Sequence, residues 1–211
     1  RRAGQPAQPV ALKLFKGAVT SDGLPQDEMA ACVQAGAHPA LTTPLAVIEG
    51  HPQGTQGMLM PLIPGDHVNL AGPPSFDSCT RDVYADGQRI NPEAAWQLLS
   101  SMAHALAWLH ARGVMHGDFY AHNILWRPDT GQALLGDFGA ATVLPQPCAG
   151  PASELLALEV RAFGCLVEEV VQRCDGFEQS RRELLSALMA VCLQTDPARR
   201  PTMADMADKL R

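Results

Sequence analysis

The sequence lacks several features that define common classes of protein. Its 211 residues contain no long uncharged apolar run and no apolar segment behind an N-terminal basic patch, so it predicts neither a membrane span nor a signal peptide. An excess of basic residues is also missing, and the net charge of −6 argues against a nucleic-acid surface. With 46% hydrophobic and 18% charged residues, the composition indicates a globular protein of one domain or two tightly joined lobes.

Paired cysteine motifs and an initiator methionine are missing too. None of the cysteines forms a Cys-x-x-Cys, so no zinc site is expected. Several lie in apolar helical context, which indicates reduced core thiols of an intracellular, cytoplasmic protein. Because the chain opens on Arg1-Arg2, we expect a piece of a longer chain that can carry further domains. The six cysteines are Cys32, Cys79, Cys148, Cys165, Cys174 and Cys192.

The most informative stretch runs from residue 114 to residue 141 and carries three candidate acceptor groups on two short loops. Asp118 is followed five positions later by Asn123, and Asp137 follows after two apolar runs. Those runs, 123–126 and 133–136, flank a turn-forming Pro-Asp-Thr-Gly and predict a β-hairpin. The hairpin would bring Asn123 and Asp137 to the same end, where their oxygens can share Mg²⁺.

This arrangement is the one that phosphoryl transfer requires, with one carboxylate for the nucleophile and an amide and a carboxylate for the metal. The alternative is an ordinary hairpin with polar surface residues. The stretch resembles the catalytic loop and the Asp-Phe-Gly motif of the protein kinase family. The resemblance implies that Asp118 orients a hydroxyl and accepts its proton, and that Asn123 and Asp137 bind Mg²⁺.

Residues 10–15 read as a strand and 27–35 as a helix that ends at Gly36. The strand resembles the Val-Ala-Ile-Lys strand of kinases, whose Lys holds the nucleotide phosphates. Glu28 lies 15 positions after Lys13, about where the family has a helix Glu paired with that Lys. The resemblance therefore implies a Lys13–Glu28 ion pair, against the alternative that both side chains are solvated.

Two further strands are expected at 45–48 and 57–65. The second resembles the strand that leads into the kinase hinge, which would make Met60 the gatekeeper and would set backbone groups from Pro61 to Ile63, including Leu62, against an adenine edge. Leu125 in the hairpin completes the residues assigned to the ATP site. A plain buried strand is the competing interpretation of 57–65.

The rest of the chain predicts helices around an irregular connector at 64–90, for which no chemistry is expected. Asn91 and Pro92 open a core helix whose His104 and His110 are expected on the surface. In the apolar helix at 152–172, Glu159 stands where the family has an Asp that braces the catalytic loop. The closing element 192–202 resembles the family's Asp-Pro-x-x-Arg-Pro-Thr and implies that Arg200 pairs with Glu154.

The sequence departs from the family pattern at several points. No Gly-x-Gly-x-x-Gly precedes Lys13, and the segment after Asp137 is short. Gly117 replaces an Arg that reads activation-loop phosphate, so no such switch is expected. Tyr120 and His122 occupy the places of substrate-contacting basic residues; His122 either contacts substrate phosphate or is an ordinary loop residue.

These observations predict an α+β, two-lobed protein-kinase-like fold, with a small β-rich lobe and hinge at 1–63 and a mostly helical lobe at 64–211. The predicted function is ATP- and Mg²⁺-dependent phosphoryl transfer to a protein Ser or Thr hydroxyl. Two alternatives remain: a small-molecule phosphotransferase of the aminoglycoside or choline kinase type, and a pseudokinase that binds without turnover. The wording around Asp118 also resembles bacterial kinase-like domains attached to leucine-rich repeats.

Overall fold

The structure is a computed structural model that describes residues 9–19, 23–49, 51, 54–78 and 81–211. The described residues form an α+β fold with five α-helices and small antiparallel sheets. The strands are β1 Val10–Leu14, β2 Ala46–Ile48, β3 Gly57–Pro61, β4 Val68–Asn69, β5 Val114–Met115, β6 Ile124–Trp126, β7 Ala133–Leu135 and β8 Thr142–Val143. The helices are α1 Pro25–Ala35, α2 Pro92–Ala111, α3 Pro151–Val171, α4 Gln179–Cys192 and α5 Met203–Lys209, with single 3₁₀ turns η1 Ala121–Asn123 and η2 Pro197–Arg199.

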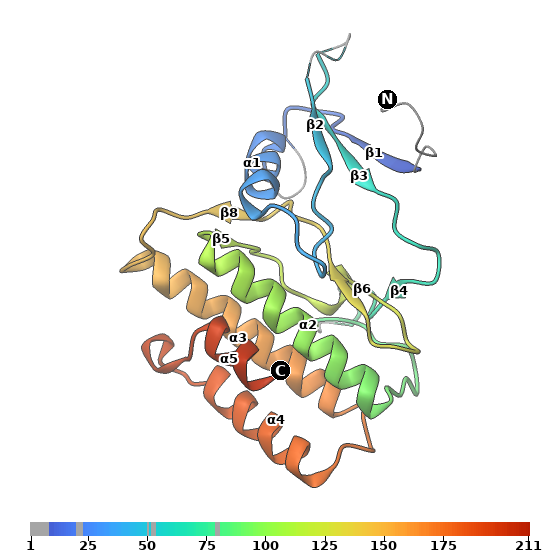
Figure 1. Ribbon diagram of the computed structural model, residues 1–211, viewed down its shortest axis with the longest axis vertical. Coiled ribbons are helices and arrows are strands. Elements are labelled where there is room, and N and C mark those ends of the chain that lie inside the picture. The colour runs from blue at the N-terminus through green and yellow to red at the C-terminus, as the bar shows by residue number, and fades with distance from the viewer. Residues whose placement is uncertain (1–8, 20–22, 50, 52–53, 79–80) are drawn as a thin grey trace.

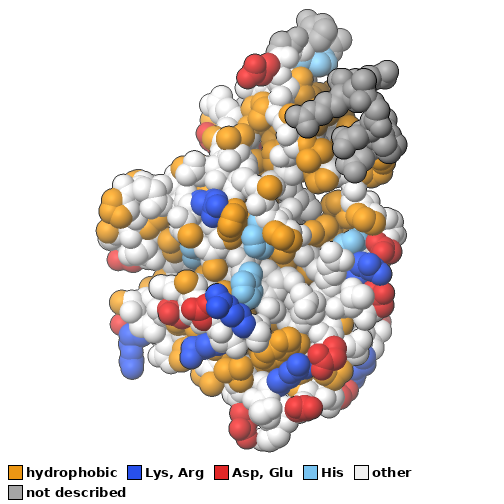
Figure 2. Space-filling model, in the orientation of Figure 1, with side chains coloured by type: hydrophobic (Ala, Val, Ile, Leu, Met, Phe, Trp, Pro, Cys, Tyr) orange, Lys and Arg blue, Asp and Glu red, His pale blue; other side chains and the backbone are white. Residues whose placement is uncertain are grey.

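The N-terminal sheet has the order β1-β3-β2, and both of its pairings are antiparallel. Figure 1 shows this sheet and α1 at one end of the molecule and the helices α2 to α5 packed at the other. Alternate residues of β1 are exposed, including Val10, Leu12 and Leu14. On the face seen in Figure 2, hydrophobic side chains gather around this sheet, whereas side chains of both charges are scattered over the helical end.

Helix α1 is fixed at both of its ends. Pro25 starts it with a preset φ and without an orphan N–H, and Gly36 ends it in the left-handed region at φ 63°. Its last turn is tied to the end of α2, where Trp108 Nε1 donates to the Ala35 carbonyl at 2.8 Å and Gln34 donates to the Arg112 carbonyl at 3.0 Å. The orientation of α1, and of the residues on it, is therefore set by the larger part of the fold.

Helix α2 is the centre of the hydrophobic core. The Asn91 side chain accepts the Ala94 N–H at 2.8 Å, which is the cap that the sequence predicts. One face of the helix is fully buried and packs against α3 and α5. The buried large side chains of that face are Leu98, Leu99, Met102, Leu106 and Leu109.

The predicted hairpin is present, and the connector before it has more structure than the sequence suggested. Strands β6 and β7 pair antiparallel, with Ile124 opposite Leu135. Strand β4, which lies in the connector 64–90, pairs with the other edge of β6, and Gly72 and Val83 form a two-hydrogen-bond bridge within the same connector. The interpretation of this connector as irregular was therefore only partly right.

The described cysteines lie mostly in the core, as expected. Cys32, Cys165, Cys174 and Cys192 are buried, Cys148 is partly exposed, and all five are free thiols. Cys79 lies outside the described residues. Within the described part of the chain, the helices do not combine the length and the hydropathy that crossing a bilayer requires.

Candidate active site

Asp118 and Asn123 meet on the loop that joins β5 to β6. Asn123 Nδ2 donates to Asp118 Oδ2 at 2.8 Å and to the Asp118 backbone carbonyl at 3.0 Å. Both side chains are half-buried. Because the Asn123 amide nitrogen is bonded to Asp118, the Asn123 amide oxygen remains free to bind a cation. The same bonds orient the Asp118 carboxylate within the loop.

Asp137 has an unusual backbone conformation directly after β7. Its φ of 55° makes it the one non-glycine residue with positive φ among the residues described, and such strain concentrates at functional sites. The next residue, Phe138, is buried and packs edge-on against His116 at a centroid distance of 5.1 Å. His116 Nε2 lies 2.8 Å from the Gly136 carbonyl. These contacts hold the backbone on both sides of Asp137 and leave its own side chain exposed.

The hairpin brings Asn123 and Asp137 to the same end, as the sequence predicts. The Gly136 N–H donates to the Asn123 carbonyl at 3.0 Å, and Asp137 is the next residue. The two side chains offer the hard oxygens that suit Mg²⁺, which keeps several water or phosphate ligands. The described residues contain no group of three or more His, Cys, Asp or Glu that could hold a metal ion.

The predicted ion pair between Lys13 and Glu28 is present. The Glu28 side chain is 5% exposed and the Lys13 side chain 40%, so the carboxylate is buried beneath a cation that still reaches solvent. Burial, and next the Glu28 carboxylate, raise the pKa of the nearby Cys32 thiol to about 12, and Asp137 contributes in the same direction.

Backbone hydrogen bonds join the segment after α1 to the hairpin. The Thr42 N–H donates to the Leu135 carbonyl at 2.9 Å, and the Leu135 N–H donates to the Ala40 carbonyl at 2.8 Å. These bonds attach the chain that leaves α1 to the strand that ends just before Asp137. As a result, Glu28 and Asp137 belong to one connected framework.

The residues assigned to the nucleotide base lie at the end of β3 and in the hairpin. Met60 and Pro61 end β3, opposite Ala11 and Val10 of β1. Leu62 is 56% exposed, and Ile63 is half-buried. Leu125 lies on β6, between Asn69 and Leu134 of the neighbouring strands. Contact of these residues with ATP stays a prediction.

Glu159 of α3 braces the catalytic loop, as the sequence predicts. Its carboxylate accepts the N–H of Gly117 at 3.0 Å and of His116 at 3.3 Å. It also lies 2.8 Å from His110 Nε2. The expectation that His110 is a surface residue was wrong, because its side chain is only 11% exposed. Its ring nitrogen gives the buried Glu159 carboxylate a hydrogen-bond partner. The side chain of His104 is half-buried, with Nδ1 at 2.8 Å from the Ser100 carbonyl.

The contacts of Glu159 predict how stability depends on pH. Burial alone would raise the pKa of Glu159, but its hydrogen bond to His110, the charges of His110 and His116, and the Gly117 N–H outweigh burial and lower it. The unfolded chain, with a Glu pKa of about 4.3, therefore binds the proton more readily than the folded protein. The stabilisation is present above that value and is lost as the pH falls through the folded pKa.

Glu159→Gln is therefore expected to lower the free energy of unfolding at pH 7 by about 2 to 3 kcal/mol, the scale of a hydrogen bond to a buried charge. Urea unfolding between pH 3 and pH 7 measures this, and the deficit should shrink at the acidic end. Glu168→Gln, at an exposed position of the same helix, should cost little at any pH. A deficit that does not vary with pH would contradict the assigned role of the carboxylate.

The expected ion pair between Arg200 and Glu154 does not form, although the structure describes both residues. Arg200 donates instead to the carbonyls of Gln194 at 2.8 Å, Ala157 at 2.9 Å and Thr195 at 3.3 Å. Glu154 lies exposed in the first turn of α3. Three carbonyls satisfy the guanidinium donors, so this Arg closes a turn against α3 without a carboxylate partner.

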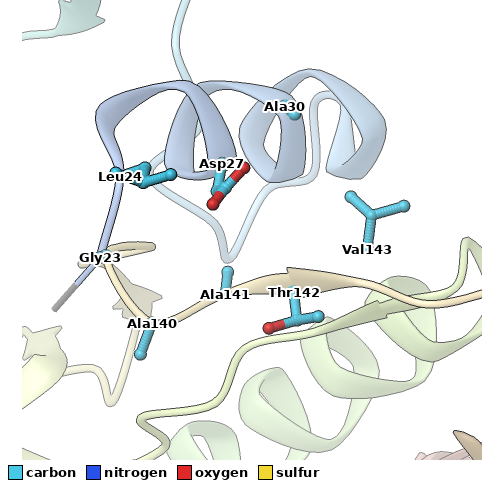
Figure 3. Close-up of a pocket in the computed structure, with 9 residues that line it drawn as sticks. Gly23, Leu24, Asp27, Ala30, Ala140, Ala141, Thr142 and Val143 are labelled. Carbon is cyan, nitrogen blue, oxygen red and sulfur yellow. The ribbon is translucent and has the colours of Figure 1, made fainter.

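A cavity of about 370 Å³ separates the start of α1 from the segment that follows Asp137. Figure 3 shows Asp27 of α1 pointing toward the segment that carries Ala141 and Thr142. The residues that line the cavity include Asp27 but no Lys or Arg. The lining also includes Gly139, whose N–H donates to Asp137 Oδ1 at 3.2 Å, so the cavity adjoins the candidate site.

Sequence reasoning missed Asp82, a buried residue of the connector. Its carboxylate accepts the N–H of Ala121 at 3.1 Å and of His122 at 2.9 Å. It also lies 2.7 Å from His122 Nδ1. The contact with Asp82 accounts for the orientation of the His122 ring, which agrees with the interpretation of His122 as an ordinary loop residue. No local pattern marks Asp82, since its partners lie about 40 positions away.

Comparison with known families agrees with the catalytic-loop geometry. Residues 76–141 match the model of the lipopolysaccharide kinase (Kdo/WaaP) family. This is a protein-kinase-like family, and the match includes Asp118, Asn123 and Asp137 but covers less than half of the chain. A comparison with curated proteins found no match. The similarity indicates a kinase-type phosphotransferase; the association with leucine-rich repeats finds no support in it.

Proposed function

We propose that the protein transfers the γ-phosphoryl group of ATP to a hydroxyl of a sugar-containing or other small acceptor. The observation that carries this proposal is the convergence of Asp118, Asn123 and Asp137 at one end of the hairpin, which backbone hydrogen bonds join to the segment that follows α1, the helix of Glu28. Phosphoryl transfer depends on positioning and on charge stabilisation. The site offers both, through an oriented carboxylate and a set of oxygen groups that suit a cation.

Each residue has a distinct role in this proposal. Asp118 orients the acceptor hydroxyl and receives its proton, since its carboxylate is held by Asn123 at 2.8 Å. Asn123 and Asp137 hold Mg²⁺, which neutralises phosphate charge when bound. Lys13 contacts the phosphates, and the buried Glu28 keeps its ammonium group in place.

The acceptor is the point on which the comparison changes the sequence-based prediction. A protein Ser or Thr hydroxyl was the first expectation, and a small-molecule acceptor was the alternative. The family matched by residues 76–141 is described as a kinase of lipopolysaccharide, which carries sugar hydroxyls. That match supports the alternative better than the protein acceptor, and the segment between Asp137 and Glu154 is short for docking a peptide.

The finer description of the fold belongs to the same proposal. We assign residues 1–63, of which 1–8, 20–22, 50 and 52–53 lie outside the described residues, to a small β-rich lobe with the hinge. Residues 64–211 form the helical lobe. Support comes from the separation seen in Figure 1 between the β1-β3-β2 sheet with α1 and the helices α2 to α5. Met60, Pro61, Leu62 and Ile63 would then line the junction where the adenine binds.

ATP binding is expected to require Mg²⁺ and the Asp137 carboxylate. At about 100 times the dissociation constant, MgATP should stabilise the protein by about 2.7 kcal/mol, which raises the melting temperature by roughly 5 to 10 °C. Removing Mg²⁺ with EDTA should abolish most of the shift. Asp137→Asn removes a metal-binding charge, so we expect MgATP to bind about tenfold more weakly.

Asp129→Asn is the matched control, because it makes the same change in the exposed turn at the opposite end of the hairpin. It should leave the MgATP shift unchanged. Equal shifts with and without Mg²⁺ would contradict the metal site. A Mg²⁺-dependent shift without any ATP turnover, tested on deacylated lipopolysaccharide and on a protein rich in Ser and Thr, would instead support the pseudokinase alternative.

A further inference from the structure

The connector between β3 and α2 places a fully buried carboxylate against the catalytic loop. The Asp82 side chain is 0% exposed. One of its oxygens accepts the Ala121 N–H, and the other accepts the His122 N–H and lies 2.7 Å from the His122 ring. Burying a carboxylate without hydrogen-bond partners would strongly destabilise the fold. The bonds from the Ala121 and His122 N–H groups therefore offset the cost of burying the Asp82 charge.

The residues around Asp82 are anchored to α3. Arg81 Nε donates to Glu169 at 3.2 Å, and the Tyr84 hydroxyl donates to the same carboxylate at 2.9 Å. The Val83 N–H and carbonyl are bonded to Gly72. Residues on both sides of Asp82 are therefore attached to a helix of the core, which fixes the place of its carboxylate.

The element that Asp82 contacts is intrinsically weak. The turn η1 is a single 3₁₀ turn of three residues, and such short elements seldom hold their geometry alone. Its last residue is Asn123, whose amide orients Asp118. On the other side of Asp118, Glu159 holds the N–H groups of His116 and Gly117. Asp118 thus lies between two backbone segments that are each fixed by a buried carboxylate from another part of the fold.

We propose that Asp82 is a positioning residue of the phosphoryl-transfer site, acting through η1 to hold Asn123 where its oxygen binds Mg²⁺. This inference rests on the proposed function, because it takes Asn123 as a metal-binding residue. Asp82 itself is buried and touches neither nucleotide nor acceptor. In this arrangement the connector, together with α3, keeps the loop in its active geometry, a task that does not require phosphorylation of the segment after Asp137.

The test measures Mg²⁺ dependence of ATP binding and local amide exchange in the whole chain. Asp82→Asn keeps the shape but turns an N–H donor toward the N–H groups of η1. We expect the Mg²⁺ concentration for half-maximal ATP binding to rise about tenfold, as for other residues that orient metal ligands. Hydrogen exchange should accelerate in a peptide covering 119–124 and stay unchanged in one covering 105–117.

Two companion variants separate the possible outcomes. Asp86→Asn makes the same change at an exposed position of the same connector and should alter neither measurement. Asn123→Ala should raise the Mg²⁺ midpoint. If Asn123→Ala raises it and Asp82→Asn does not, the positioning role is overturned while the proposed function stands. If Asn123→Ala has no effect, both fall.

Loss of global stability is distinguished by the pattern of exchange. If exchange in Asp82→Asn accelerates throughout the molecule without a change in the Mg²⁺ midpoint, Asp82 is a stability residue and the proposal is overturned. Should that variant fail to fold, Tyr84→Phe weakens the anchor and keeps the carboxylate. It is expected to raise the midpoint about threefold and to accelerate exchange in 119–124, and an unchanged midpoint there overturns the proposal as well.

Discussion

Replacing Asp118 with Asn is expected to lower the rate of phosphoryl transfer about 10³-fold, the scale of a lost general base, and to leave MgATP affinity unchanged within a factor of about two. In the proposed mechanism the carboxylate acts on the incoming hydroxyl, so its loss should raise the transition-state barrier without weakening ground-state binding of the nucleotide. The Asn side chain can still accept the hydrogen bond from Asn123, which leaves the loop intact. Transfer of labelled γ-phosphate to deacylated lipopolysaccharide, with calorimetric MgATP titration alongside, measures both quantities.

Asp129→Asn serves again as the control and should retain transfer and binding. The comparison with Asp137→Asn is equally informative, because that variant should lose affinity as well as transfer. If Asp118→Asn and Asp137→Asn lose MgATP affinity to the same degree while transfer per bound nucleotide persists, the assigned roles are wrong.

Gly117→Ala is expected to destabilise the fold by about 3 kcal/mol or more. Gly117 has a φ of 81°, and a Cβ atom there would lie 2.3 Å from the Ala140 carbonyl oxygen. Left-handed backbone alone costs a residue with a Cβ about 1 to 2 kcal/mol, and a backbone collision adds to it. For a chain of this size we expect the melting temperature to fall by roughly 6 to 12 °C.

Gly87→Ala separates the two contributions. Gly87 has a similar φ of 68°, but a Cβ there meets nothing within 4 Å. It should therefore show only the backbone cost of about 1 to 2 kcal/mol, a smaller fall in melting temperature than in Gly117→Ala. Equal losses in the two variants would show that the contact with Ala140 is unimportant.

The Gly117 contact also explains a departure noted in the sequence. The protein kinase family has an Arg beside its catalytic Asp, whereas a Cβ at position 117 would collide here with the Ala140 carbonyl of the segment that follows Asp137. Position 117 therefore cannot supply a cation for a phosphate on Thr142. Asp82 and Glu159 hold the loop by buried contacts.

The features that the sequence by itself determined are those with short-range causes. Hydrophobic periodicity and caps located α2 and its start at Asn91, and the turn residues between two apolar runs located the hairpin. The proximity of Asn123 and Asp137 then followed from the hairpin, because the first residue of one strand and the last residue of the other meet at its open end. The Lys13–Glu28 pair was predicted from the resemblance to the kinase family, which has a helix Glu at about this distance after the strand Lys, and the structure contains it.

The features that only the tertiary structure decided involve partners far apart in the chain. Asp82 meets the loop about 40 positions later, His110 meets Glu159 at a separation of 49, and Arg200 meets Ala157 at 43. Whether a charged side chain is solvated or buried depends on which distant segment packs against it. Local sequence carries no signal of that packing, so His110 looked exposed, Arg200 looked paired with Glu154, and Asp82 looked like an ordinary residue of the connector.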